Sequence, residues 1–323
     1  MSINFAIVGP GRIARNQLTP AVNQVDEARL WSVLSRDRGR AAEFAEANSA
    51  RSPAPAYTDL EKLVSDPELD AVIIATPDKL HAQEVITCAK AGKHVLVEKP
   101  MATDVEDAKA MVHACEEAGV RLGVAHHLHW HNGHRLLVEK IRASALGPIR
   151  HMRVQWTIKS EDASNWRASP EVGQWWSIAA VGTHCLDLIR WIMVPSCGEV
   201  ESINSMLSNK VWGGPHDETA ILSMRFESGA TAEFCSSVLI EAPSKAEIYG
   251  ADGHAICDGT LGPHGAGTIH INGNELEYET KNPYAGEIQD FVNAIRDGRS
   301  PEVDGKEGAR NVELLVMATG VHP

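Results

Sequence analysis

Phe5-Ala6-Ile7-Val8 runs directly into Gly9-Pro10-Gly11-Arg12-Ile13-Ala14 near the start of the chain. The apolar run predicts a β-strand, and the glycines predict a turn from that strand into a helix. With so little side chain at the turn, a dinucleotide pyrophosphate can approach the backbone and lie against the positive end of the helix. An ordinary strand-to-helix turn has the same pattern, so this interpretation depends on support further along the chain. The residues that we assign to cofactor binding here are Gly9, Gly11, Arg12 and Ile13.

The second strand is expected to end about twenty residues later, in the sequence Leu30-Trp31-Ser32-Val33-Leu34-Ser35-Arg36-Asp37. At such a strand tip an acidic residue binds the adenosine ribose of NAD, whereas small hydroxyl and basic residues suit the 2′-phosphate of NADP. Ser35 and Arg36 occupy the expected tip, and Arg40 lies four residues beyond Arg36. This arrangement favours NADP. Asp37 is also within reach of the ribose, so NAD stays open as the alternative. Arg36, Arg38 and Arg40 would also fit a solvated helix start.

The composition is that of an ordinary enzyme with two domains. The chain has 323 residues and a formal net charge of −13, and its length allows two domains that each bury a core. The negative charge disfavours a nucleic acid or an anionic membrane as partner, because either needs a basic face. We expect a cytoplasmic protein, since no secretion signal is evident and no apolar run approaches the roughly 20 residues of a membrane helix. The six cysteines form no C-x-x-C pair and are expected to be reduced thiols.

Strand-like and helix-like patterns alternate through about residue 125. The expected strands include residues 71–75 and 94–97, and the expected helices include residues 81–91 and 104–118. Such alternation predicts a doubly wound parallel sheet. From residue 149 the pattern changes to longer alternating strands, which predict a mostly antiparallel sheet with few helices. These strands are expected at residues 149–158, 200–208, 219–227, 231–238, 245–250 and 268–271, with a late amphipathic helix at residues 287–296.

The chain is therefore expected to have an α/β fold in two domains. Residues 1–122 are assigned to a dinucleotide-binding domain. Residues 123–323 are assigned to an α+β domain built on an open-faced, mostly antiparallel sheet. The second domain is expected to supply the substrate pocket and an oligomer interface.

Two motifs end neighbouring strands of the predicted parallel sheet. Ala75-Thr76-Pro77, followed by His81, ends one strand, and Glu98-Lys99-Pro100 ends the next. Open sheets of this type bind ligands at the carboxyl ends of their strands, so both motifs are expected to face the cofactor. The further residues assigned to cofactor binding are thus Ser35, Arg36, Arg40, Ala75, Thr76, Pro77, His81, Glu98 and Lys99.

A later motif, Gly182-Thr183-His184-Cys185-Leu186-Asp187, completes a resemblance to the Gfo/Idh/MocA family of glucose-fructose oxidoreductases and inositol dehydrogenases. The resemblance extends through Asp217-Glu218-Thr219-Ala220 and the helix that ends in Arg296-Asp297-Gly298-Arg299. It implies a Rossmann domain followed by a substrate-binding and oligomerisation domain. The implied activity is that of an NAD(P)-dependent oxidoreductase, which transfers a hydride between the nicotinamide cofactor and a sugar, keto sugar or cyclic polyol. The implied assembly is a homodimer or homotetramer.

The resemblance assigns Lys99 and His184 to the catalytic centre. A carbinol needs one group to take its proton as the hydride leaves and an ionised donor to hold its oxygen. Histidine has an ordinary pKa near ~6.5, whereas lysine starts near ~10.4 and would need a depression of about 3 units, roughly 4 kcal/mol, to act as a base at neutral pH. We therefore expect His184 to be the base and Lys99 to polarise the oxygen.

One position departs from the family pattern. An aspartate usually stands four residues before the histidine and completes a Lys-Asp-His set, but here that position is Ala180. Asp187 lies one helical turn beyond His184, where it could either hydrogen-bond to the imidazole or serve helix packing. The missing aspartate argues against the usual mechanism for this chain. It also argues, less strongly, against catalysis itself.

Aromatic residues cluster shortly before the histidine, as Trp166-Arg167 and Trp175-Trp176. An indole face commonly carries the apolar side of a sugar ring, and a nearby arginine can bind a hydroxyl or a carboxylate. Tryptophans that pack the seam between the domains would give the same pattern. The residues assigned to substrate binding are Lys99, His127, Trp166, Arg167, Trp176 and His184.

The run His126-His127-Leu128-His129-Trp130-His131 resembles a metal site, since imidazole is a ligand of zinc and copper. No metal is expected there, because the run aligns with the strand by which the family leaves its nucleotide domain. His127 and His129 are instead expected to line the cleft.

Two other functions fit the same motifs. One is an NAD-dependent glycosidase of the family, in which transient oxidation at a sugar carbon acidifies the neighbouring C–H and permits elimination. The other is a non-catalytic regulator that binds NADP and a sugar. Retention of Lys99 and His184 argues for chemistry, whereas Ala180 argues the other way.

Overall fold

The computed structural model describes residues 2–169, 171 and 173–320, which divide into two compact units. The first contains the residues up to His126 together with Tyr284–Val312, and the second contains His127–Pro283 and the residues from Glu313 onward. The late segment Tyr284–Val312 thus groups with the first unit, although the sequence pattern placed it in the second domain. The reason is packing: Tyr284, Ile288 and Phe291 are buried in the apolar core of the first unit.

The first unit is built on a six-stranded parallel sheet in the order β3-β2-β1-β4-β5-β6. The strand order reverses between β1 and β4, and in doubly wound sheets ligands bind beyond the carboxyl ends of the strands at such a point. The four residues of β4 are all buried, as expected of a strand covered on both faces. The strands are β1 (Ile3–Val8), β2 (Ala28–Leu34), β3 (Ala56–Tyr57), β4 (Ala71–Ile74), β5 (His94–Glu98) and β6 (Leu122–Ala125).

Helices follow the strands of this unit in alternation, which confirms the predicted doubly wound pattern. Asp37, Asp59 and Asp104 each accept a hydrogen bond from a backbone N–H of the helix that follows, and so act as N-caps. The helical segments are η1 (Ala14–Leu18), α1 (Thr19–Gln24), α2 (Arg38–Ala47), α3 (Leu60–Val64), η2 (Asp78–Leu80), α4 (His81–Lys90), α5 (Val105–Ala118) and α8 (Pro283–Asp297). The residues of α9 (Gly305–Thr319) divide between the two units after Val312.

The second unit is built on an eight-stranded sheet in the order β14-β13-β12-β11-β7-β10-β9-β8. Only the β10–β7 pair is parallel among the described pairings of this sheet. The strand β12, for which the sequence pattern gave no prediction, pairs β11 with β13. The strands are β7 (Ile149–Thr157), β8 (Val200–Ser208), β9 (Thr219–Phe226), β10 (Thr231–Ser237), β11 (Lys245–Gly250), β12 (His254–Asp258), β13 (Thr268–Ile271) and β14 (Asn274–Glu275).

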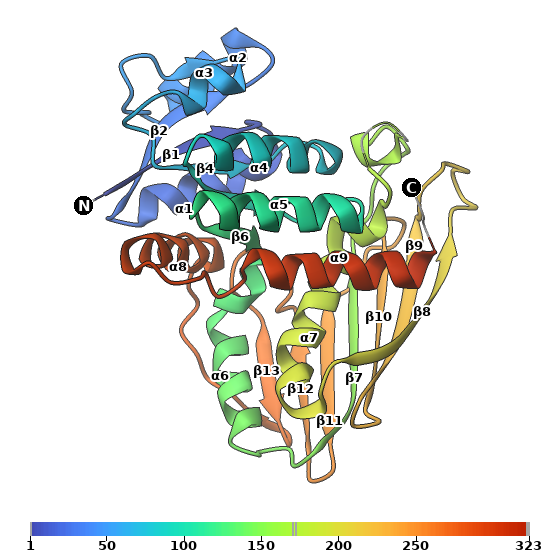
Figure 1. The fold of residues 1–323 in the computed structure, drawn as a ribbon. Coiled ribbons are helices and arrows are strands. Elements are labelled where there is room, and N and C mark those ends of the chain that lie inside the picture. Colours follow the sequence, from blue (N-terminus) through green and yellow to red (C-terminus); the bar gives the residue numbers. More distant parts are fainter. Residues whose placement is uncertain (1, 170, 172, 321–323) are drawn as a thin grey trace. The chain divides into compact units, whose positions relative to one another are not determined.

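Helices cover one face of this sheet and leave the other open, as Figure 1 shows. Along β9, Ala220, Leu222 and Met224 are buried while Ile221 and Arg225 are exposed, so alternate side chains face the core and the solvent. This confirms the α/β fold class with an open-faced, mostly antiparallel second sheet. The helical segments are η3 (His127–Trp130), α6 (Asn132–Arg142), η4 (Trp166–Ala168), η5 (Ile178–Gly182) and α7 (Thr183–Cys197).

The helical stretch Ile178–Cys197 is long and apolar enough to cross a membrane by length and composition. The expectation that no apolar run approaches that length is therefore wrong. Most of the stretch is buried within the second unit. A core helix of this kind meets the same criterion as a membrane span, because both are apolar around much of their circumference.

Candidate functional site

The glycine turn of the first unit combines a tightly packed glycine with an open one. Gly9 has a φ of +88°, and a Cβ placed on it would lie 2.8 Å from the carbonyl oxygen of Ala75. A Cβ on Gly11 would meet only the Gly9 carbonyl oxygen, at 4.0 Å. Gly9 is therefore required for the contact between the ends of β1 and β4, whereas Gly11 leaves space in front of the helix. This open backbone fits a dinucleotide pyrophosphate.

The tip of β2 presents basic side chains to solvent. Ser35 is buried, and its backbone N–H donates to the Tyr57 carbonyl oxygen at 3.1 Å. Arg36 and Arg40 are both exposed. The Asp37 carboxylate accepts a hydrogen bond of 2.7 Å from the Arg40 backbone N–H, so one of its oxygens caps α2. The arrangement leaves two guanidinium groups next to the position expected for the adenosine ribose.

The two motifs that end β4 and β5 are joined by His81. Its Nδ1 lies 3.1 Å from the Pro100 carbonyl oxygen, and its Nε2 lies 3.0 Å from the Thr76 carbonyl oxygen. The hydroxyl of Thr76 donates to Glu84 Oε2 at 2.5 Å, and burial raises the pKa of Glu84 to about 7. Lys99 is buried at this edge of the sheet. The residues predicted to face the cofactor thus gather at the carboxyl ends of neighbouring strands.

His184 lies in the first turn of α7, in the second unit, and its ring has two aromatic neighbours. The indole of Trp156 stacks on it with a centroid distance of 5.3 Å, and the ring of His127 meets it edge-on at 4.8 Å. His184 is 4% exposed. Gly182 permits this placement, because a Cβ there would lie 2.9 Å from the Ser236 Oγ on β10. The structure thus brings His127 and His184 together, and it adds Trp156, which the sequence interpretation missed.

Asp217 fixes the chain where η5 begins. Its carboxylate accepts hydrogen bonds from the backbone N–H of Trp176 and of Ile178, each at 2.9 Å, and from the Ser177 hydroxyl at 2.5 Å. Burial raises the pKa of Asp217, while these hydrogen bonds lower it. The sequence interpretation quoted Asp217 only as part of a family motif. Its role depends on contacts about 40 residues away in sequence.

Glu218, the next residue, fixes a second aromatic side chain. Its carboxylate accepts from the backbone N–H groups of Val211 and Trp212, both at 2.8 Å. The ring of Trp212 stacks on Trp176 with a centroid distance of 5.0 Å. The carboxylates of Asp217 and Glu218 thus accept hydrogen bonds from the backbones of Trp176 and Trp212, the two members of this stacked pair. No sequence signal marked Trp212, because the pair joins segments far apart in the chain.

The remaining tryptophans near the site differ in exposure. Trp166 is partly exposed, and the Arg167 guanidinium lies 4.1 Å from the centroid of its ring. This contact places the two residues together, as expected for a cation–π pair. Trp175 is buried, and its Nε1 donates to the Thr319 hydroxyl, which indicates a packing role.

The histidine run divides into pairs with different partners. His129 Nε2 lies 2.9 Å from Asp187 Oδ2. The Asp187 carboxylate is thus a hydrogen-bond partner of His129. His131 stacks on His134, with 4.2 Å between the ring centroids. Across residues 2–169, 171 and 173–320, no group of three or more His, Cys, Asp or Glu side chains is placed to hold a metal ion.

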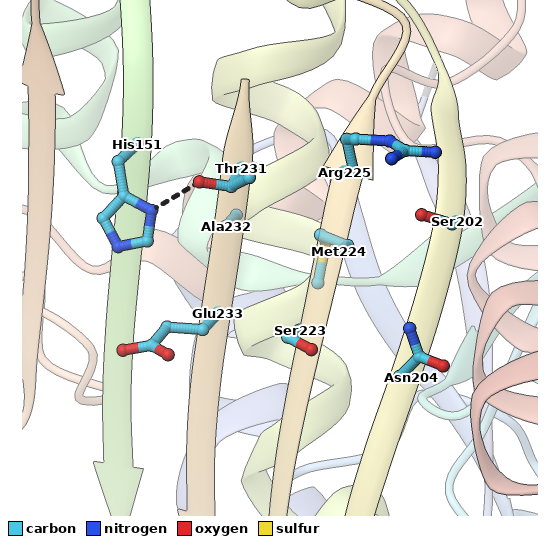
Figure 2. Close-up of a pocket in the computed structure, with 9 residues that line it drawn as sticks. All are labelled: His151, Ser202, Asn204, Ser223, Met224, Arg225, Thr231, Ala232 and Glu233. Carbon is cyan, nitrogen blue, oxygen red and sulfur yellow. Dashed lines mark hydrogen bonds between the residues drawn. The ribbon is translucent and has the colours of Figure 1, made fainter. Parts of the chain in front are cut away.

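A shallow groove of about 340 Å³ lies on the open face of the second unit's sheet (Figure 2). The residues that line it come from β7, β8, β9 and β10. None of the residues assigned to cofactor or substrate binding lines it. The groove is lined by His151, Ser202, Asn204, Ser223, Met224, Arg225, Thr231, Ala232 and Glu233.

These features define a class of protein: a dinucleotide-dependent oxidoreductase with a doubly wound nucleotide-binding unit and a second unit on an open sheet. Two family models match the chain. One, described as an oxidoreductase family with an NAD-binding Rossmann fold, matches residues 3–126, and the other, the GFO/IDH/MocA C-terminal domain, matches residues 134–256. The chain belongs to the Gfo/Idh/MocA family.

Similar proteins extend over nearly the whole chain. The 1,5-anhydro-D-fructose reductase of Ensifer adhaerens is 29% identical over 98% of this chain and 94% of its own length. A D-xylose 1-dehydrogenase (NADP(+)) of Haloferax volcanii is 28% identical over 94% of this chain and 92% of its own. The crystal structure of an aldose-aldose oxidoreductase from Caulobacter crescentus has a TM-score of 0.90 at 23% identity, with 98% of this chain and 96% of that chain covered. This last similarity shows the shared fold.

Proposed function

We propose that the protein transfers a hydride between NADP and a CH–OH carbon of a sugar, keto sugar or cyclic polyol. The observation that carries this proposal is the placement of His184, almost fully buried at the start of α7 with its ring held by Trp156 and His127. A buried imidazole with a fixed orientation suits a general base. The names of the relatives, which include a reductase of an anhydro sugar and a dehydrogenase of a pentose, support a carbohydrate substrate.

The chemistry assigns different roles to the two ionisable residues. When bound, the nicotinamide ring donates or accepts the hydride. His184 takes the proton of the substrate hydroxyl, and Lys99 donates a hydrogen bond to the same oxygen, which stabilises the negative charge that develops there. Trp156 and His127 keep the imidazole in one orientation. Trp166, Arg167 and Trp176 form the substrate wall in this proposal.

The direct test is an assay of a panel of sugars, keto sugars and inositols with NADP and with NAD. The reaction is run in both directions and monitored by the absorbance of the reduced cofactor. We expect turnover with at least one carbohydrate. Release of a sugar without net cofactor reduction would instead identify the glycosidase reaction. Binding of cofactor and sugar with no turnover across the panel would identify the regulator.

Arg36→Ala is expected to remove most of a preference for NADPH over NADH. A charge-assisted hydrogen bond to a phosphate contributes roughly 1.5–3 kcal/mol, so the ratio of the two dissociation constants should fall by about 10-fold to 150-fold. Arg29→Ala is the matched control, because Arg29 is an exposed arginine on the same strand, before its carboxyl end. Equal dissociation constants in the native protein would contradict the assignment of NADP.

Ala180→Asp is expected to lower turnover rather than restore a missing carboxylate. Ala180 is partly exposed, and its backbone N–H donates to the Trp176 carbonyl oxygen at 2.8 Å. A longer side chain at this position would therefore lie one helical turn from Trp176, which belongs to the proposed substrate wall. Ala180→Asn has nearly the same size without the charge and separates crowding from repulsion. The measurement is kcat and KM on the best substrate. A several-fold gain in kcat for Ala180→Asp with KM unchanged would show that the site lacks only its orienting group.

We propose that copies of the chain associate through the open face of the second unit's sheet. Met206 and Ile221 are paired in register on β8 and β9, with 73% and 43% of their surface exposed. Ile221→Glu is therefore expected to lower the mass measured by light scattering, from a dimer or tetramer toward the monomer. Ile240→Glu, at an exposed isoleucine outside the described strands, is the control. An unchanged mass for Ile221→Glu, or a monomeric native protein, would contradict this interface.

The cysteines are consistent with a reducing compartment. All six lie among the described residues as free thiols, and five of them are buried. We propose a cytoplasmic location on this basis. Mass spectrometry of protein alkylated at the moment of lysis would test it, because a disulfide in the native protein would contradict the proposal.

A further inference from the structure

His81 is a buried histidine with a carbonyl oxygen against each ring nitrogen. Nδ1 lies 3.1 Å from the Pro100 oxygen, and Nε2 lies 3.0 Å from the Thr76 oxygen. A carbonyl oxygen only accepts hydrogen bonds, and a neutral imidazole carries a single N–H. A neutral ring would therefore turn a lone pair toward one of the two oxygens. An imidazolium has an N–H on each side and donates to both.

The charged groups around His81 come from several elements. Asp78, which is 2% exposed, lies three residues earlier in η2, and Glu84 lies three residues later in α4. Glu98, the last residue of β5, and Lys99, which follows it, are both buried. Two turns further along α4 lies Cys88, whose neighbours are Glu84, Glu61 of α3, Lys93 and the Cys115 thiol of α5.

Several influences oppose a positive charge at this position. His81 is fully buried, and it begins α4, where the helix dipole disfavours a cation. Lys99 adds a like charge beside Pro100. Two charge-assisted hydrogen bonds exceed the contribution of one helix terminus. The balance favours the doubly protonated ring.

We propose that His81 is an imidazolium that clamps the carboxyl ends of β4 and β5 and thereby acts as a positioning residue for Lys99. His81 contacts the carbonyl oxygen of Pro100, and Pro100 directly follows Lys99 in the chain. The clamp therefore acts on Lys99 through the backbone. On the other side it holds Thr76, whose Cγ2 would lie 3.0 Å from a Cβ placed on Gly9. One ring thus links the segments that follow β1, β4 and β5. Its kinetic consequence rests on the proposed hydride transfer, whereas its charge state does not.

The charge state is tested on the full chain without cofactor, labelled with ¹⁵N-histidine, by long-range ¹H–¹⁵N spectra. The signal absent from His81→Gln identifies the ring, and contacts of the ring protons with Thr76 identify it independently if that variant does not fold. We expect both ring nitrogens of His81 to be protonated between about pH 6 and 8. His113, an exposed histidine of the same unit, serves as the internal reference. One unprotonated ring nitrogen at neutral pH would overturn the proposal.

The positioning role is tested by kinetics. His81→Gln is expected to lower kcat by about tenfold or more while the dissociation constant of the cofactor changes by a few-fold, and His113→Gln should leave both unchanged. Unchanged kcat in His81→Gln would overturn the positioning role. A protonated His81 in a chain that turns over no carbohydrate would contradict the proposed function and leave the clamp standing. A neutral His81 in an active enzyme would overturn the clamp and leave the proposed function standing.

Discussion

Lys99→Met and His184→Ala should each lower turnover by at least about 100-fold, because one variant removes the donor that stabilises the developing oxyanion and the other removes the base. The effect should fall on kcat, since the proposed function assigns both groups to the reacting oxygen. The dissociation constant of the cofactor should change by no more than a few-fold. The measurement is steady-state kinetics on the best substrate, combined with cofactor titration.

Two controls make this result specific. Lys109 and His113 are exposed on α5, and Lys109→Met and His113→Ala should leave turnover unchanged. Circular dichroism of the Lys99 and His184 variants should match that of the native protein. Near-native turnover in either variant would remove that residue from the catalytic role.

Asp217→Ala should lower both the stability and the activity. It leaves the backbone N–H groups of Trp176 and Ile178 and the Ser177 hydroxyl without their buried acceptor. A buried, unsatisfied polar group costs about 1–3 kcal/mol, so we expect a loss of roughly 3 kcal/mol or more in the free energy of unfolding. Because η5 continues directly into α7, the freed segment should also misplace His184 and lower kcat.

The graded variant Asp217→Asn separates this effect from simple loss of volume. An asparagine keeps one carbonyl acceptor, so its stability should lie between those of the native protein and Asp217→Ala. Urea unfolding and kcat are measured on the same samples. Native stability in Asp217→Ala would show that water or another group replaces the carboxylate, and it would contradict the assigned role.

The predictable parts of this protein were those in which local sequence dictates the backbone. The turn after β1 needs a glycine, because Gly9 has a positive φ and packs against Ala75. Residues 71–75 were predicted as a strand because every side chain there is apolar, and β4 covers Ala71–Ile74. The strands at residues 200–208 and 245–250 were found at the same bounds.

The candidate site was predictable only in part. The ends of β4 and β5 follow from strand order, and so the sequence brought Thr76 and Lys99 to the same edge of the sheet. The partners of the buried polar groups did not follow. His129 pairs with Asp187 across 58 residues, and nothing in the local sequence pattern predicts this contact.

By itself, the sequence determined the family, the fold class and the residue types available for chemistry, because these depend on motifs and on local periodicity. Only the tertiary structure decided that Trp212 stacks on Trp176, that Trp156 stacks on His184, and that Tyr284–Val312 belongs to the first unit. The physical reason is the same in each case. Periodicity shows which side of a segment is apolar, but the surface that this side meets is set by the path of the whole chain and by the packing of distant segments.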